Sequence, residues 1–168
     1  MGISISAFTF QSNNLNSEYC CSSKLDAEKL SVEVDRIYSI NENNESLSLS
    51  FRSYSNLKNY LDFLSNEINI EGFEHHFLGS EGVITNNECQ ELLSVIDKNM
   101  DKIKAITWKE YAFSYYSDYD DKKEFLDSIE HVTKRCYQSE QALMNCRFRM
   151  LISLLRFAVK QHGFIEYG

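Results

Sequence analysis

The sequence contains no proline, and only 6 of its 168 residues are glycine. Without proline there is no stiff polyproline segment, so every turn must use Gly, Asn, Asp or Ser. So little glycine excludes a collagen-like chain and argues against a glycine-rich loop that cradles phosphates. GxSxG and HExxH motifs are also missing. The common hydrolase and nucleotide-binding signatures are therefore absent.

Long apolar runs are missing as well. The most apolar stretch, Met150–Val159, is interrupted by Ser153 and Arg156, whereas a membrane-spanning helix needs about 20 apolar residues. The first eight residues have no basic region of the kind that opens a secretory signal. The five cysteines form no CxxC pair, which favours a reducing compartment. We expect a cytoplasmic protein that does not contact membranes.

What the chain does contain is typical of a single folded domain. Apolar residues make up 43% of the sequence and charged residues 25%, and a chain of this length can bury a core without disulfides or metal. We therefore expect one domain spanning residues 1–168 and no cofactor.

Alternating apolar residues predict the strands. Ile3, Ile5 and Ala7 alternate with polar residues and indicate an N-terminal strand, and Phe164–Tyr167 indicates a C-terminal one. Residues 25–40 fit either a helix or a strand. The polar cluster 41–45 predicts a turn, which favours a central hairpin that pairs Leu30–Ile40 with Ser46–Phe51.

Helical spacing of apolar residues predicts the other elements. One helix is expected over Tyr54–Asn66, capped by Ser53 or Ser55. A second opens at a capping box formed by Thr85 and Glu88 and continues to about Lys104.

Beyond Lys122, the same spacing predicts one long helix that Gly163 stops, or two helices broken near Gln138–Gln141. The expected fold is α+β, with a small mixed or antiparallel sheet packed against three to four helices.

Three short motifs carry a resemblance to a known group of proteins. They are Phe51-Arg52-Ser53-Tyr54-Ser55, Gly79-Ser80-Glu81-Gly82-Val83-Ile84 and Gly163-Phe164-Ile165-Glu166-Tyr167. The chain resembles, over about residues 46–168, a broad group of small bacterial proteins with no assigned activity. The resemblance implies a fold template and a bacterial cytoplasmic setting. This sequence departs from the group by having Gly79-Ser80 where an Asp is common and by an insertion through its tyrosine-rich segment.

Two places contain residue types that carry chemistry. Glu74, His75 and His76 could ligate a metal, but adjacent histidines on a strand point in opposite directions, so a solvated loop is favoured. The pair Glu81-Gly82 is either a structural turn, in which glycine permits a positive φ, or a functional turn in which Glu81 is a buried carboxylate.

The position of one cysteine favours a lowered thiol pKa. Cys89 lies in the first turn of the helix that begins after Thr85, where the helix dipole lowers a thiol pKa. Cys89 is therefore the cysteine to test, although the sequence does not decide whether it is reactive.

Charge is unevenly distributed along the chain. Residues 1–100 contain 6 Lys+Arg and 15 Asp+Glu, whereas residues 101–168 contain 11 and 10. An acidic surface repels nucleic acid and attracts basic proteins. We expect a basic protein partner and no nucleic acid.

The segment Trp108–Asp121 combines aromatic and acidic residues. Tyrosine and tryptophan dominate binding hot spots, and carboxylates suit a cationic partner. The alternative is that the aromatic residues at helical spacing cover the core. The predicted partner-binding residues are Trp108, Tyr115, Tyr116, Asp118, Tyr119, Asp120 and Asp121.

These observations favour a non-enzymatic interaction protein of the immunity, antitoxin or inhibitor type, of bacterial or phage origin. A small metal-dependent hydrolase that uses Glu81 and His75 or His76 is the alternative. A structural subunit whose oligomer seam contains Leu155 and Phe157 is a third possibility. The sequence does not decide the oligomeric state.

Overall fold

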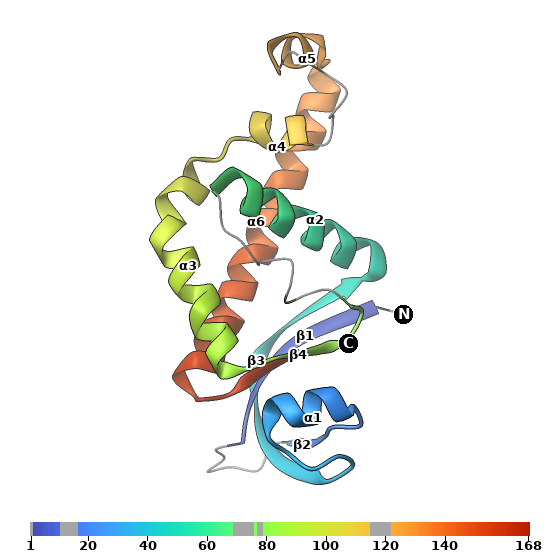
Figure 1. Ribbon diagram of the computed structural model, residues 1–168. Helices are drawn as coiled ribbons and strands as arrows, with labels where there is room; N and C mark the ends of the chain where they lie inside the picture. Colours follow the sequence, from blue (N-terminus) through green and yellow to red (C-terminus); the bar gives the residue numbers. More distant parts are fainter. Residues whose placement is uncertain (1, 11–16, 69–75, 77–78, 115–121) are drawn as a thin grey trace.

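Five strands form one antiparallel sheet with the order β2-β3-β1-β5-β4. The computed structural model describes residues 2–10, 17–68, 76, 79–114 and 122–168 (Figure 1). The elements are β1 (Gly2–Thr9), β2 (Ser17–Cys20), α1 (Lys24–Leu30), β3 (Ile37–Ser50), α2 (Phe51–Ile68), β4 (Gly82–Ile84), α3 (Asn86–Ala105), α4 (Trp108–Ser114), α5 (Lys122–Ser128), α6 (His131–Lys160) and β5 (Phe164–Tyr167). The predicted α+β class is confirmed.

The two ends of the described chain meet in the centre of the sheet. Strand β1 pairs with β5 on one edge, with Ile5 opposite Tyr167, and with β3 on the other edge. Both terminal strands expected from the sequence are therefore confirmed, and β5 joins β1 to β4.

The predicted central hairpin is wrong. Residues 41–45 continue one long strand, β3, which pairs with β2 at its start and with β1 afterwards. The register shifts between Ser6 and Phe8, which lie opposite Ser46 and Glu42. The polar cluster is thus a bulge within a strand, a local irregularity that extra residues on one strand produce. Residues 25–40 fitted either a helix or a strand, and the structure has a helix at the start of this segment, α1.

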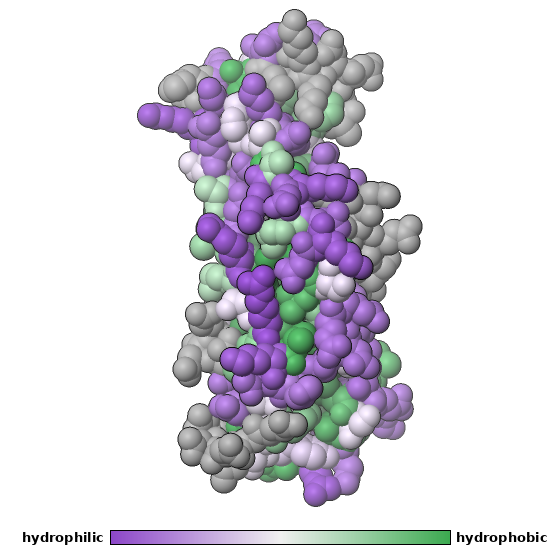
Figure 2. Space-filling model, turned by 90° about the vertical axis from the view of Figure 1, so that its left-hand side faces the viewer, coloured by the Kyte–Doolittle hydropathy of each residue, from purple (hydrophilic) through white to green (hydrophobic). Residues whose placement is uncertain are grey.

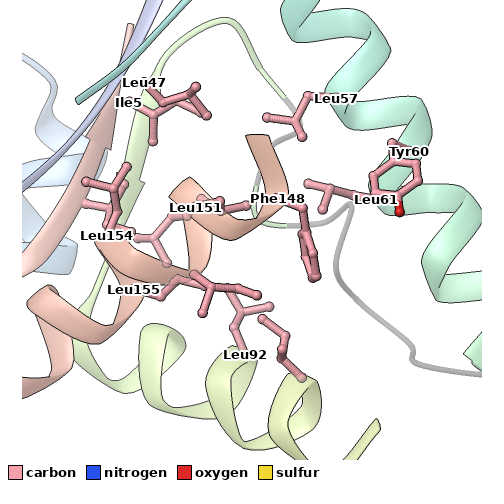
Figure 3. Close-up of a cluster of buried hydrophobic side chains, with 14 of the residues drawn as sticks. Ile5, Leu47, Leu57, Tyr60, Leu61, Leu92, Phe148, Leu151, Leu154 and Leu155 are labelled. Atoms are coloured by element: carbon pink, nitrogen blue, oxygen red, sulfur yellow. The ribbon is translucent and has the colours of Figure 1, made fainter. Parts of the chain in front are cut away.

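Alternate residues of the strands face the helices and form the inner face of the sheet. Helices α2, α3 and α6 lie on this side, above the sheet in Figure 1. Figure 3 shows side chains from β1, β3 and these helices meeting in one apolar cluster. Its members include Ile5, Leu47, Leu57, Leu61, Leu92, Phe148, Leu151, Leu154 and Leu155.

The opposite, outer face of the sheet is covered only in part. Helix α1 and strand β2 lie below it in Figure 1, and a small aromatic cluster joins them to the sheet. The rings of Phe8, Tyr19 and Phe164 are 5.1 to 6.1 Å apart, centroid to centroid. The rest of this face is polar.

Serine or threonine hydroxyls lie at the starts of α1, α2, α3 and α4. Helix α2 begins earlier than predicted, because the Ser50 hydroxyl accepts a hydrogen bond from the Ser53 backbone N–H at 3.2 Å. Ser53 and Ser55 therefore lie inside the helix and do not cap it. The capping box of Thr85 and Glu88 is confirmed. A second pair with the same spacing, Thr107 and Glu110, joins the start of α4, with the Thr107 N–H 2.6 Å from the carboxylate.

The long C-terminal helical pattern breaks once, at residues 129–130, and not near Gln138–Gln141. Two residues after α6 ends, His162 adopts a left-handed conformation with a φ of 51°. The next N–H, that of Gly163, reaches back to the Ala158 carbonyl at 2.8 Å, as in a Schellman motif. Glycine is needed at 163 for space, because a Cβ there would lie 1.9 Å from the Phe8 carbonyl oxygen.

Helices α4 and α5 pack against the start of α6, far from the sheet (Figure 1). Buried side chains of Ala112, Phe125 and Tyr137 form a separate small cluster there. Within the described residues, no helix combines enough length and apolar character to cross a membrane.

Candidate functional site

An acidic cavity of about 460 Å³ opens on the outer face of the sheet. Its wall comes from β1, β2, β3, β5, helix α1 with the loop that precedes it, and the start of β4 with the turn before it. Four carboxylates line it, and no described lysine, arginine or histidine does. We define the acidic cavity by these carboxylates and one aromatic ring: Asp26, Glu42, Glu81, Glu166 and Tyr19.

Glu166 is a partly buried carboxylate of the cavity. It lies on β5 between Ser6 of β1 and Val83 of β4, because the strand register places these residues side by side. Burial raises the pKa of its carboxyl, the nearby Tyr19 hydroxyl lowers it, and the charges of Asp26 and Glu42 raise it further. The net direction is upward, so the cavity disfavours its own negative charge.

Tyr19 supplies a buried hydroxyl with unused hydrogen-bonding capacity. Its side chain is 5% exposed, and the hydroxyl makes no hydrogen bond of standard geometry with a described residue. It does interact electrostatically with Glu166, and burial followed by that charge raises the pKa of the phenol. A buried polar group without a hydrogen bond is uncommon in folded proteins and calls for an explanation.

Serine hydroxyls extend the polar surface from the cavity along the sheet. Ser4, Ser46, Ser48 and Ser50 alternate with the buried residues of β1 and β3 and are exposed. The hydroxyls of Ser4 and Ser48 are 3.2 Å apart across the two strands. This face therefore offers many acceptors and little apolar area.

Chemically, the arrangement suits a cation that donates hydrogen bonds. An ammonium or guanidinium group would neutralise carboxylates that repel one another and would bond to the hydroxyls around them. Desolvated carboxylates bind such a group more strongly than solvated ones do.

The predicted partner-binding segment is described only at its start. Trp108 is half-buried and packs against the small cluster of Ala112, Phe125 and Tyr137. The Lys134 ammonium lies 5.6 Å from the centre of the Trp108 ring. Tyr111, on the same helix, is completely buried. Tyr115, Tyr116, Asp118, Tyr119, Asp120 and Asp121 lie outside the described residues.

Of the three weak candidates for a metal ligand, Glu74, His75 and His76, the structure describes only His76. His76 is near Glu88, with Nδ1 3.9 Å from the carboxylate oxygen, whereas Glu74 and His75 lie outside the described residues. In the part of the chain that is described, no group of three or more His, Cys, Asp or Glu side chains could hold a metal ion.

The turn at Glu81-Gly82 has a structural role and also borders the cavity. Gly82 has a φ of 157°, and a Cβ there would lie 2.7 Å from the Tyr167 hydroxyl. The alternative of a buried carboxylate at Glu81 does not hold, because the side chain is exposed at the rim. Glu166, in the same cavity, is partly buried.

The question of whether Cys89 is reactive, which the sequence leaves open, is answered by its burial. Its side chain is completely buried in the inner core. Burial, together with the charge of Glu88, raises the thiol pKa to about 12, so the effect of the helix dipole is outweighed. Among the other thiols, Cys20, Cys136 and Cys146 are exposed.

Comparisons with family models, with curated proteins and with solved structures found no match for this chain. The resemblance of its three short motifs to a group of bacterial proteins therefore stays a prediction. What can be said about function depends on the geometry of the chain itself.

Proposed function

We propose that the chain is a non-enzymatic interaction protein, of the immunity, antitoxin or inhibitor type, that binds a basic surface of a partner protein. The acidic cavity receives a lysine or arginine side chain of that partner. The observation that carries this proposal is the set of four carboxylates that share one cavity with no described cation.

Two further observations support the proposal. Three of the four carboxylates, Asp26, Glu42 and Glu81, come from the half of the sequence in which acidic residues outnumber basic ones. The Tyr19 hydroxyl, buried beside Glu166, makes no hydrogen bond of standard geometry with a described residue, so an inserted donor can bond to it together with the Glu166 carboxylate. Complementary charge of this kind raises association rates and selects partners.

A labelled peptide of six arginines is a direct probe, measured by fluorescence anisotropy at low and at physiological salt. The triple variant Asp26→Asn, Glu42→Gln, Glu166→Gln removes three charges from the cavity. We expect it to weaken binding about tenfold, the loss of a single well-formed charged contact.

The matched control removes the same number of charges from exposed positions outside the cavity, Asp62→Asn, Glu91→Gln and Asp101→Asn. Equal weakening by the two triple variants would mean that net charge alone attracts the peptide, and the cavity would lose its role. The two triple variants are then used in co-purification from the native host, and the partner proteins that each one retains are compared.

The aromatic and acidic segment remains a second contact candidate. Its residues beyond Ser114 are untested by the described structure. The other alternative surface, around Leu155 and Phe157, is occupied by the chain itself, since Leu155 is completely buried and Phe157 packs against the inner core.

A further inference from the structure

A second cavity, with the opposite charge, lies between α3 and α6. It measures about 660 Å³, within the range of small-molecule sites. The two helices run antiparallel (Figure 1), and an ion pair of 3.3 Å between Arg156 and Asp97 links them. We call this cavity the α3–α6 groove.

The floor of the groove is apolar. Ile103, Phe148 and Ile152 line it and are at least nine-tenths buried, and the partly buried Met100 and Ile106 complete it. Figure 2 views the side of the molecule that carries α3 and shows apolar side chains exposed in a strip between hydrophilic ones.

The rim of the groove is basic, although the protein has a net charge of −8. Lys104, Arg149 and Arg156 line it, and no described carboxylate does. Arg156 is paired with Asp97. Within the described residues, neither Lys104 nor Arg149 has a carboxylate partner.

These two cations lie near each other because of the helix register. The ion pair places Asp97 of α3 beside Arg156 of α6. Lys104 follows Asp97 by seven residues, which is about two helical turns, and Arg149 precedes Arg156 by the same number. Because the helices are antiparallel, both steps lead in the same direction, and Lys104 and Arg149 lie at the same end of the groove.

Asn145 adds a hydrogen-bond donor at that end. The Tyr60 hydroxyl donates to its Oδ1 at 2.5 Å, which fixes the carboxamide and leaves its N–H donors without a described partner. Because Asn145 is one turn before Arg149 on α6, the two side chains lie on the same face of the helix.

We propose that the α3–α6 groove binds a small carboxylic acid with an aliphatic body, such as a medium-chain fatty acid. Its carboxylate lies between Lys104, Arg149 and Asn145, and its chain covers the apolar floor toward Arg156. The inference rests on the groove alone and does not depend on the basic partner proposed above.

Isothermal titration calorimetry with decanoate, below its micelle concentration, tests the proposal. Decyltrimethylammonium has the same chain and the opposite charge. We expect saturable binding of one decanoate per chain and none of the cation. The double variant Lys104→Gln, Arg149→Gln should weaken decanoate binding about tenfold, because charge-assisted hydrogen bonds are lost.

The matched control is Lys98→Gln, Lys102→Gln, which removes two exposed charges of α3 that do not line the groove. It should leave the affinity within about twofold, because exposed charges outside a site act only through a screened field. Any of three results would overturn the proposal: no saturable binding of decanoate, equal binding of the cation, or equal weakening by both double variants. Binding of an acidic amphipathic peptide without decanoate would overturn it in favour of a protein partner.

Discussion

The inner and outer faces of the sheet are made from alternate residues of the same strands, yet the inner face is apolar, whereas the outer face is polar outside one aromatic cluster. On β5, Ile165 points into the core and is completely buried, whereas the neighbouring Glu166 lines the acidic cavity. On β3, Leu47 is buried and Ser48 is exposed. The period of two in a strand thus separates a face that stabilises the fold from a face free to bind a ligand.

Replacing the inner-face residue of β5 should have the largest effect. Ile165→Ala removes buried methyl groups and leaves a cavity, so the free energy of unfolding should fall by about 3 kcal/mol. Urea denaturation followed by circular dichroism measures the change. The control Ser48→Ala, on the exposed outer face, should stay within about 0.5 kcal/mol. Similar losses in the two variants would contradict the division between the faces.

The next largest effect is expected where β5 approaches β1. Gly163→Ala places a Cβ against the Phe8 carbonyl, so the backbones must separate, at a cost of about 2 kcal/mol. Gly168→Ala is the control, since the nearest atom to its added Cβ, on Glu81, is 3.6 Å away. Thermal melts of the two variants give the comparison. A Gly163→Ala protein as stable as wild type would mean that the strands are not packed as described.

A smaller effect concerns the outer face and depends on pH. The Glu166 pKa is raised above its ordinary value of 4.5 in the folded protein, so the folded state binds this proton more readily than the unfolded chain does. Glu166 therefore costs stability above the raised pKa, and the cost disappears as pH falls to 4.5 and below. Glu166→Gln should be more stable than wild type at pH 7.

The advantage of Glu166→Gln should shrink as the pH approaches 4.5, which denaturation at several pH values would show. A difference between the two proteins that does not change with pH would mean that Glu166 titrates normally. Glu91→Gln, at an exposed position, supplies the baseline.

The smallest effect is on the reactivity of the thiols. Cys20, Cys136 and Cys146 are exposed, whereas Cys21 and Cys89 are buried. A thiol reagent such as Ellman's reagent should modify three cysteines quickly in the native protein and the other two only after unfolding. Cys89→Ala should leave the rapid phase unchanged, and Cys20→Ser should reduce it by one thiol. A rapid phase that disappears with Cys89→Ala would identify Cys89 as the reactive thiol.

Local patterns in the sequence predicted the elements whose signals are local. The capping box at Thr85 and the alternation of Ile3 and Ile5 involve residues only a few positions apart, and both predictions are confirmed. The turn predicted at residues 41–45 is wrong, because a polar cluster in a bulge has the same composition as a polar cluster in a loop.

The acidic cavity could not be predicted in the same way. Asp26, Glu42 and Glu166 are far apart along the chain. The pairing of β1 with β3 and β5 brings Glu42 and Glu166 together, and the packing of α1 against the outer aromatic cluster through Ala27 adds Asp26. The Glu166 pKa depends on burial that a list of residues does not contain. The one available signal was Glu166 itself, a charged residue within an otherwise apolar terminal strand.

The position of β5 has a consequence for how the chain folds. Strand β1 pairs with β3, its neighbour in the sequence among the long strands, and with β5, from the opposite end of the chain. Closing so long a loop is entropically costly and slow, so the second pairing is a late event. Until β5 arrives, β1 exposes a row of unpaired amides beside Ile3, Ile5 and Ala7, which makes the unfinished sheet prone to aggregate. The window between these two pairings is when the protein most needs protection by a chaperone.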